Sequence, residues 1–155
     1  MKECLAAYLK QQGAPFELIE KARTVHTADA AAAAGVDLTL VTKSLVCLAP
    51  DRRACVAIIP GDHHLDFKAL AKALNLKKLR LCPLHEAHRY SGYEPGATPP
   101  VHYRKVAAVV MDRSLLNLDW LYGGGGSNEY LVKLRPADVI RLNDALVATI
   151  SSREA

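Results

Sequence analysis

The sequence predicts an α+β fold in which a mixed β-sheet is flanked by helices. Helical and strand-like segments follow one another irregularly, two apolar runs are joined as a hairpin, and no regular strand–helix–strand repeat occurs. The 155 residues are 50% hydrophobic and 23% charged, and they contain no linker-like stretch. We therefore expect one domain that spans residues 1–155 and has its own core.

The first predicted elements are short. Residues 2–12 place apolar side chains at helical spacing and end at Gly13, and residues 16–20 alternate like a strand. An alanine-rich helix then begins at Thr27, which can cap it, and ends at Gly35 in the position typical of a helix stop.

A hairpin forms the centre of the predicted sheet. Residues 41–48 and 54–59 are apolar runs separated by a polar turn that contains a proline. This pairing brings Cys47 close to Cys55, and in a reducing compartment we expect both to be free thiols.

The second half of the chain also mixes predicted helices and strands. Asp66 caps a helix with apolar side chains at core-facing spacing. A short strand near 79–81 and a helix over 83–89 follow. Beyond residue 100 the pattern predicts strands near 107–111, 118–122 and 129–134, a turn at 112–116, a helix over 136–143 and a last strand over 145–150.

The segment 91–100 carries three prolines and two glycines. Proline lacks an N–H and fixes φ, and glycine permits backbone shapes closed to other residues, so this segment is a turn or a rigid, shaped loop. With Lys43 and the glycine run 123–126, it predicts a pocket walled by backbone amides with one cation at its edge. Such a pocket suits a ligand with carbonyl and phosphate oxygens.

Lys43 and the glycine run each have two interpretations. Lys43 shares a strand face with Val41, Leu45 and Cys47. It either reaches water from the strand end, which the pattern alone favours, or supplies positive charge to an anion over a pocket. The glycine run forms either an anion-binding nest or a flexible hairpin tip, and it matches neither a Walker loop nor a dinucleotide fingerprint.

The remaining candidates for chemistry are weak. His85 and His88 could face one metal from a helix, but further ligands at the right spacing are missing, so we interpret them as surface histidines and expect no metal or cofactor. No serine or cysteine sits in an obvious catalytic triad. A hydrolase built on this chain would position water and stabilise an oxyanion with amides, which suffices for an activated ester such as an aminoacyl ester.

The net charge of +4 is compatible with a nucleic-acid partner. The basic residues form either a nucleic-acid-binding surface or a solvated charged face: Lys72, Lys77, Lys78, Arg80, Arg104 and Lys105. No apolar run approaches membrane-spanning length and the N-terminus lacks a secretory apolar segment, so we expect a cytoplasmic protein.

Five segments in order resemble the YbaK/ProX superfamily of aminoacyl-tRNA deacylases, which includes the editing domain inserted in bacterial prolyl-tRNA synthetases. The segments are Thr27–Val36, Thr42–Val46, Ile59–Asp66, Gly92–Pro100 and Leu121–Gly126. The resemblance implies that family's α+β fold, with a mixed and partly barrel-like sheet. It also implies that Lys43 engages the tRNA 3′ end, and that backbone near Gly96 and Ala97 holds the carbonyl and a water. Further implied substrate-binding residues are Thr27, Ser44, Gly92, Tyr93, Thr98, Pro99, Gly124 and Gly125.

The leading hypothesis is a trans-editing enzyme that hydrolyses mischarged aminoacyl-tRNA at its acceptor end, with an aminoacyl-tRNA synthetase as a further partner. The alternative is a non-catalytic module that binds an aminoacyl or nucleotide 3′ end. The sequence leaves the amino acid, the tRNA and the oligomeric state open.

Overall fold

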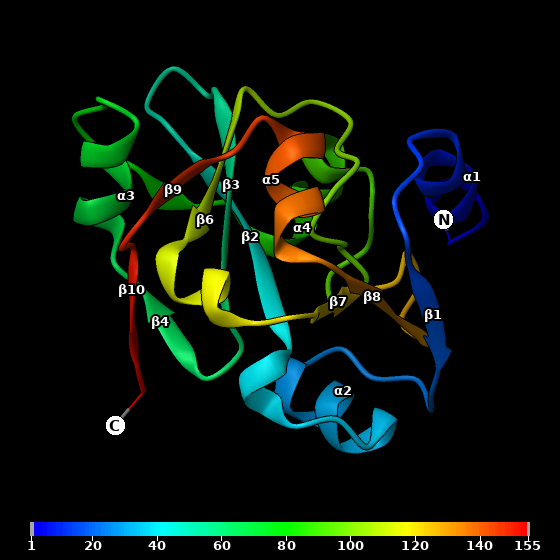
Figure 1. The fold of residues 1–155 in the computed structure, drawn as a ribbon. Coiled ribbons are helices and arrows are strands. Elements are labelled where there is room, and N and C mark those ends of the chain that lie inside the picture. The colour runs from blue at the N-terminus through cyan, green and yellow to red at the C-terminus, as the bar shows by residue number, and fades with distance from the viewer. Residues whose placement is uncertain (1, 155) are drawn as a thin grey trace.

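A computed structural model describes residues 2–154, whose ribbon is shown in Figure 1. The largest sheet has five strands in the order β5 (Arg80–Leu81), β2 (Thr42–Leu48), β3 (Ala54–Pro60), β6 (Ala108–Asp112) and β9 (Leu146–Ala148). The pairs β2–β5 and β2–β3 are antiparallel, whereas β3–β6 and β6–β9 are parallel. The expectation of a mixed sheet is confirmed.

The remaining strands form two smaller sheets. Antiparallel β1 (Glu17–Glu20), β8 (Tyr130–Leu134) and β7 (Leu121–Gly124) form one, and β10 (Ser151–Arg153) pairs with β4 (His63–Leu65) in the other. A single bridge between Val41 and Tyr122 links the first small sheet to the large one. The described strands therefore form three sheets and no closed barrel.

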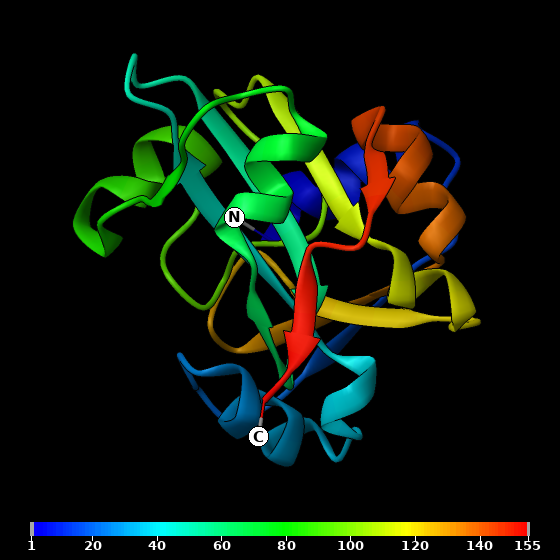
Figure 2. The same cartoon turned by 90° about the vertical axis from the view of Figure 1, so that its left-hand side faces the viewer.

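The helices flank the large sheet (Figures 1 and 2). They are α1 (Lys2–Gln11), α2 (Thr27–Ala34), α3 (Phe67–Ala73), α4 (Leu84–Ser91) and α5 (Pro136–Asn143), with short 3-10 helices η1 (Leu38–Leu40) and η2 (Arg113–Asn117). In Figure 1, α2 lies beyond the end of the sheet where β2 begins, on the opposite side of the molecule from the β2–β3 turn.

The core has two parts, because successive side chains of a strand point to opposite faces of its sheet. On β3, Val56 and Ile58 join one cluster with side chains of α1, α4 and α5. Ala57 and Ile59 join a second cluster that α3 covers. All four side chains are fully buried, so β3 is the central strand of the molecule.

The local signals in the sequence are mostly confirmed. The hairpin forms, and Cys47 lies directly opposite Cys55 with both thiols free and buried. The hydrogen bond with Cys55 and burial raise the pKa of Cys47, so this thiol stays protonated. Asp66 accepts a hydrogen bond from the Ala69 N–H at 3.0 Å, as a capping residue does.

One local prediction is corrected, and two short strands appear that the sequence did not predict. Thr27 lies inside α2 and His26 precedes the helix without a capping side-chain bond, whereas Gly35 ends the helix in the left-handed conformation as expected. The strands β4 and β10 were not anticipated, because each has only three residues and pairs across a long sequence separation.

Candidate functional site

A cavity of about 250 Å³ lies between α2, the start of β2, the proline–glycine loop and β7. Six of the residues expected at a site line it: Thr27, Lys43, Ser44, Gly96, Thr98 and Gly124. Much of its remaining wall is aliphatic, from Ala30, Val41, Leu45 and Leu131. Segments distant in the sequence thus meet in one apolar pocket with a few polar groups, the common form of a small-ligand site.

The loop wall of the cavity depends on Gly96. Its φ is +83°, and a Cβ there would lie 2.5 Å from the Val25 carbonyl oxygen and 2.8 Å from Asn128 Oδ1. Glycine is therefore required both by backbone shape and by space. The chain at Val25 and Asn128 is itself fixed by Lys21, a buried lysine whose Nζ donates to the Asn128 carbonyl at 2.6 Å.

The glycine run forms the surface on which the loop packs. Gly124 belongs to β7, and a Cβ there would collide with the Thr98 carbonyl oxygen; a Cβ on Gly123 would lie 2.7 Å from Pro100 Cδ. The Gly126 N–H donates to the Ala97 carbonyl at 3.0 Å. The absence of side chains here lets two backbone segments come into direct contact, and of the run only Gly124 lines the cavity.

Several backbone N–H groups at the cavity have no acceptor within residues 2–154, and two of them lie on the proline–glycine loop. Those of Gly96 and Thr98 donate to no oxygen within residues 2–154. The Ala97 N–H, expected to hold the carbonyl, donates to the Glu94 carbonyl at 3.0 Å in this structure. Ser44 Oγ is buried there without a hydrogen-bond partner. Gly96 is exposed and Thr98 half-buried, so their N–H groups are open to the cavity and are available to a ligand oxygen.

Lys43 reaches the cavity wall from β2 with only 23% of its side chain exposed. Its Nζ donates to the His63 carbonyl at 2.8 Å and lies 3.3 Å from a Glu154 carboxylate oxygen. The ammonium is therefore held by the β4–β10 pair and does not simply extend into water. Sequence reasoning missed both partners, because Glu154 is 111 residues away along the chain.

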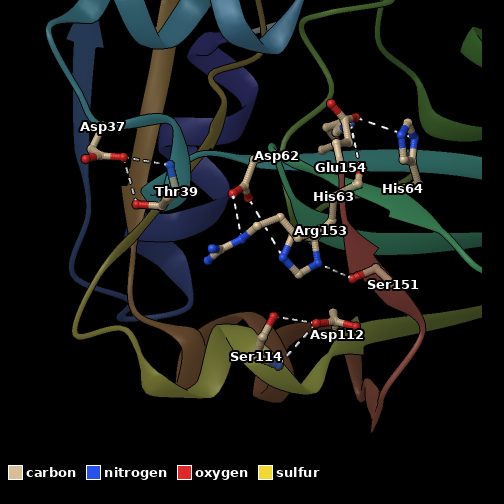
Figure 3. Close-up of polar contacts among 11 residues, drawn as sticks. Asp37, Thr39, Asp62, His63, His64, Asp112, Ser114, Ser151, Arg153 and Glu154 are labelled. Carbon is tan, nitrogen blue, oxygen red and sulfur yellow. Dashed lines mark hydrogen bonds and ion pairs between the residues drawn. The ribbon is translucent and has the colours of Figure 1, made fainter.

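A polar network surrounds these partners (Figure 3). His63 Nδ1 lies 2.7 Å from Ser151 Oγ, and Asp62 lies between His63 and Arg153, at 3.9 and 3.7 Å. Glu154 also lies 3.5 Å from His64 Nδ1. These contacts fasten the C-terminal strand to β4, and in doing so they place the carboxylate beside Lys43.

Two further reactive side chains line the cavity, His26 and Cys82. His26 is exposed at the start of α2. Burial raises the pKa of the Cys82 thiol, which keeps it protonated and makes it a poor nucleophile. Cys82 therefore lines the cavity but is not a candidate nucleophile.

The other expected site residues lie outside the cavity. Gly92 and Tyr93 line a second hollow, and Pro99 is buried, its carbonyl accepting from the Tyr103 hydroxyl at 2.7 Å. A Cβ on Gly125 would lie 2.7 Å from Tyr130 Cβ.

The six basic residues are all exposed and come from separate segments of the chain. Lys72, Lys77 and Lys78 belong to α3 and the chain after it, Arg80 lies on the edge strand β5, and Arg104 lines the second hollow. Lys105 follows Arg104, and its N–H donates to the Tyr90 carbonyl.

Within the described part of the chain, no three His, Cys, Asp or Glu side chains gather as a metal site would require. None of the helices in residues 2–154 combines the length and apolar character needed to cross a bilayer.

Residues 20–142 match the family model of the aminoacyl-tRNA editing domain. The chain is 26% identical over 120 residues to EbsC of Enterococcus faecalis, named as a candidate Cys-tRNA(Pro)/Cys-tRNA(Cys) deacylase, which covers 77% of this chain and 73% of that protein. It is 32% identical over 105 residues to the proline–tRNA ligase of Xanthomonas oryzae, 67% of this chain but only 18% of the ligase.

Solved structures share the fold. The crystal structure of the hypothetical protein APE2540 superposes with a TM-score of 0.89 at 29% identity and covers 98% of this chain and all of that one. A candidate trans-editing enzyme for prolyl-tRNA synthetase superposes with a TM-score of 0.84 at 24% identity, over 99% of this chain and 97% of that one.

Proposed function

Because the chain belongs to the aminoacyl-tRNA editing domain family, we propose that it hydrolyses the ester of mischarged aminoacyl-tRNA and releases free amino acid and intact tRNA. One observation carries the proposal. The unpaired N–H groups of Gly96 and Thr98 lie in the wall of the same apolar cavity that Lys43 lines. This arrangement suits an acyl ester with an anion nearby.

The two amides act on the ester carbonyl. As water adds to the carbonyl carbon, negative charge develops on its oxygen, and donors already in place stabilise that charge without reorganisation. The loop that carries them is rigid, because Gly96 is packed against Val25 and Asn128 and the prolines fix φ. Donors on a rigid loop favour the transition state over the ground state.

Lys43 orients the terminal nucleotide. Its ammonium is a point charge suited to a phosphate oxygen or the ribose end of the substrate. In the free protein it is shared between the His63 carbonyl and Glu154, so substrate binding replaces the weaker, partly solvated contact to Glu154.

Water is the nucleophile in this mechanism. The only cysteine in the wall is kept protonated by burial, and Ser44 Oγ lacks a basic partner within residues 2–154. An aminoacyl ester is activated by its α-ammonium group, so positioning and oxyanion stabilisation suffice. The aliphatic walls and the volume of about 250 Å³ favour a small uncharged amino-acid side chain.

The partners follow from the reaction. The substrate is the acceptor end of aminoacyl-tRNA, made in the cytoplasm by aminoacyl-tRNA synthetases, and a synthetase is the protein partner we expect. The chain spans only about a fifth of the proline–tRNA ligases that it matches.

The decisive test incubates the protein with alanyl-, cysteinyl-, seryl-, threonyl- and prolyl-tRNA, on cognate and mismatched tRNAs. We expect release of one small amino acid, with a loss of at least about a hundredfold in Lys43→Ala. Lys68→Ala, an exposed lysine on α3, is the matched control and should retain wild-type activity.

Two results would overturn the proposal. Full hydrolysis by folded Lys43→Ala would remove the lysine from the mechanism. No release from any substrate, with tRNA binding intact, would support a non-catalytic binding module instead.

A further inference from the structure

A second hollow of about 580 Å³ adjoins the cavity, between α4 and the proline–glycine loop. Its wall includes Leu84, His85, His88, Pro95 and Arg104. Leu84 and Pro95 also line the cavity, so the two hollows share a rim. A ligand anchored in the cavity can continue over this rim without leaving the protein surface.

Arg104 is the one arginine or lysine in the wall of this hollow. Its side chain is exposed and has no carboxylate partner within residues 2–154. Its main chain is fixed, because its N–H donates to the Ser91 carbonyl at 3.2 Å. A Cβ on Gly92 would lie 3.4 Å from Arg104 Cβ, so the side chain starts directly over the end of α4.

The carboxylates near this hollow are directed elsewhere. Glu86 on α4 pairs with Arg52 at 3.4 Å and Arg89 at 4.0 Å. Glu94, which does line the hollow, lies 3.8 Å from Arg23. Arg104 is therefore left with an unpaired, forked guanidinium, the group best matched to two oxygens of a phosphate.

The imidazoles and the shared rim add a second kind of contact. His85 and His88 are three residues apart on α4, so they lie on one helix face. Leu84 is 69% exposed, an unusual exposure for so large an apolar side chain at a site rim. Flat imidazoles and an exposed aliphatic surface are groups on which an unpaired nucleobase stacks or packs.

We propose that this hollow binds the nucleotide that precedes the terminal adenosine of tRNA, with its phosphodiester on Arg104. The inference rests on the proposed function, which puts the aminoacyl ester at Gly96 and Thr98 and the single-stranded 3′ end at the shared rim. Charge complementarity and the continuity of the two hollows make this nucleotide the occupant.

The test compares a substrate that can reach the second hollow with one that cannot. One is the mischarged tRNA, and the other is the same amino acid esterified to adenosine alone. Arg104→Ala should lower kcat/KM on the tRNA about tenfold, the usual loss for one charge-assisted contact, and leave the adenosine ester within about twofold of wild type. Arg89→Ala, an exposed arginine of α4 outside both hollows, is the control for lost charge and should change neither.

Salt dependence separates a phosphate contact from a structural effect. The slope of log kcat/KM against log salt concentration should become shallower by about 0.7 in Arg104→Ala, as expected when one contact to a single-stranded phosphate is lost. Arg104→Lys should restore the salt-dependence slope but only part of kcat/KM, because lysine keeps the positive charge and lacks the two-pronged guanidinium.

Binding decides the inference independently of hydrolysis. A short deacylated RNA ending in CCA should bind Arg104→Ala about tenfold more weakly than wild type or Arg89→Ala, whereas adenosine monophosphate should bind all three alike. If wild type hydrolyses neither substrate, the proposed function fails while this binding comparison still tests the hollow. Equal RNA binding by all three proteins, or an equal loss on both substrates, would overturn the inference.

Discussion

The ammonium of Lys43 is occupied before any substrate arrives. Its contact to the His63 carbonyl is short and sheltered, whereas its contact to Glu154 joins side chains that are 23% and 42% exposed. In the proposed mechanism the first contact positions the lysine, and the second competes with a substrate oxygen for the same charge. The two contacts therefore have opposite effects on binding.

Glu154→Gln tests this competition. With the carboxylate gone and the His63 contact intact, we expect KM for aminoacyl-tRNA to fall about two- to fivefold and kcat to stay within about twofold, the size typical of a partly exposed ion pair. Steady-state kinetics measure both constants. A rise in KM would mean that Glu154 assists binding instead of competing with it.

At Gly96, the lack of space for a side chain excludes other residues as strongly as the backbone conformation does. Gly35 also has a positive φ, but nothing lies within 4 Å of its would-be Cβ. Gly35→Ala should therefore cost only about 1 kcal/mol of unfolding free energy, from backbone conformation alone. Gly96→Ala should cost more than this and abolish deacylation, because the loop must leave Val25 and Asn128. Urea unfolding and activity measure the two effects; equal costs in the two variants would contradict the argument.

At the scale of elements, the proline–glycine loop is held by residues on both sides of it. The Tyr93 hydroxyl lies 2.6 Å from His102 Nδ1, the Tyr103 hydroxyl donates to the Pro99 carbonyl, and the Asn143 amide donates to the Pro100 carbonyl at 2.7 Å. A loop without a helix or strand of its own thus gains rigidity from side chains of its neighbours. This rigidity is what the proposed oxyanion-binding role requires.

Tyr93 makes the stability of this region sensitive to alkaline pH. Burial raises the pKa of its phenol to about 12, against about 10 in the unfolded chain. Below pH 10 the phenol is protonated in both states and its contribution is complete. Between about pH 10 and 12 the unfolded state ionises first, so stability falls as pH rises, by roughly 2–3 kcal/mol over the window.

Tyr93→Phe cannot ionise there and should lose stability less steeply over that window. Urea midpoints at several pH values from about 8 to 12 measure this. Parallel curves for Tyr93→Phe and wild type would rule out the phenol as the cause.

At the scale of the whole molecule, Asp112 joins the end of β6 to the C-terminal segment. It is 2% exposed, and its carboxylate accepts hydrogen bonds from the Ile150 N–H at 2.9 Å and from the N–H and hydroxyl of Ser114. The Ile150 carbonyl in turn accepts from the Asp66 N–H at 2.7 Å. One buried carboxylate therefore fixes the segment that leads into β10 and Glu154.

Asp112 has a natural control in Asp37. Asp37 caps η1 through Thr39 as Asp112 caps η2 through Ser114, but it is exposed (Figure 3). Asp37→Ala should cost about 1 kcal/mol of unfolding free energy, as a lost cap does. Asp112→Ala should cost about 2–4 kcal/mol, because it leaves buried donors unpaired. Urea unfolding of both variants measures this, and equal costs would show that burial adds nothing.

The sequence by itself determined the fold class, the hairpin, most helices and the glycine stop at Gly35, because periodicity, caps and turns act between residues close along the chain. It also pointed to Lys43 and the proline–glycine loop, whose composition is unusual for its place. Only the tertiary structure decided what these residues contact. The Thr98 carbonyl lies where a side chain on Gly124 would be, and the Ala97 N–H donates to the Glu94 carbonyl. The Lys43 ammonium contacts the Glu154 carboxylate. Such contacts join residues tens of positions apart, and no local pattern encodes which distant partner a side chain meets when the sheets pack.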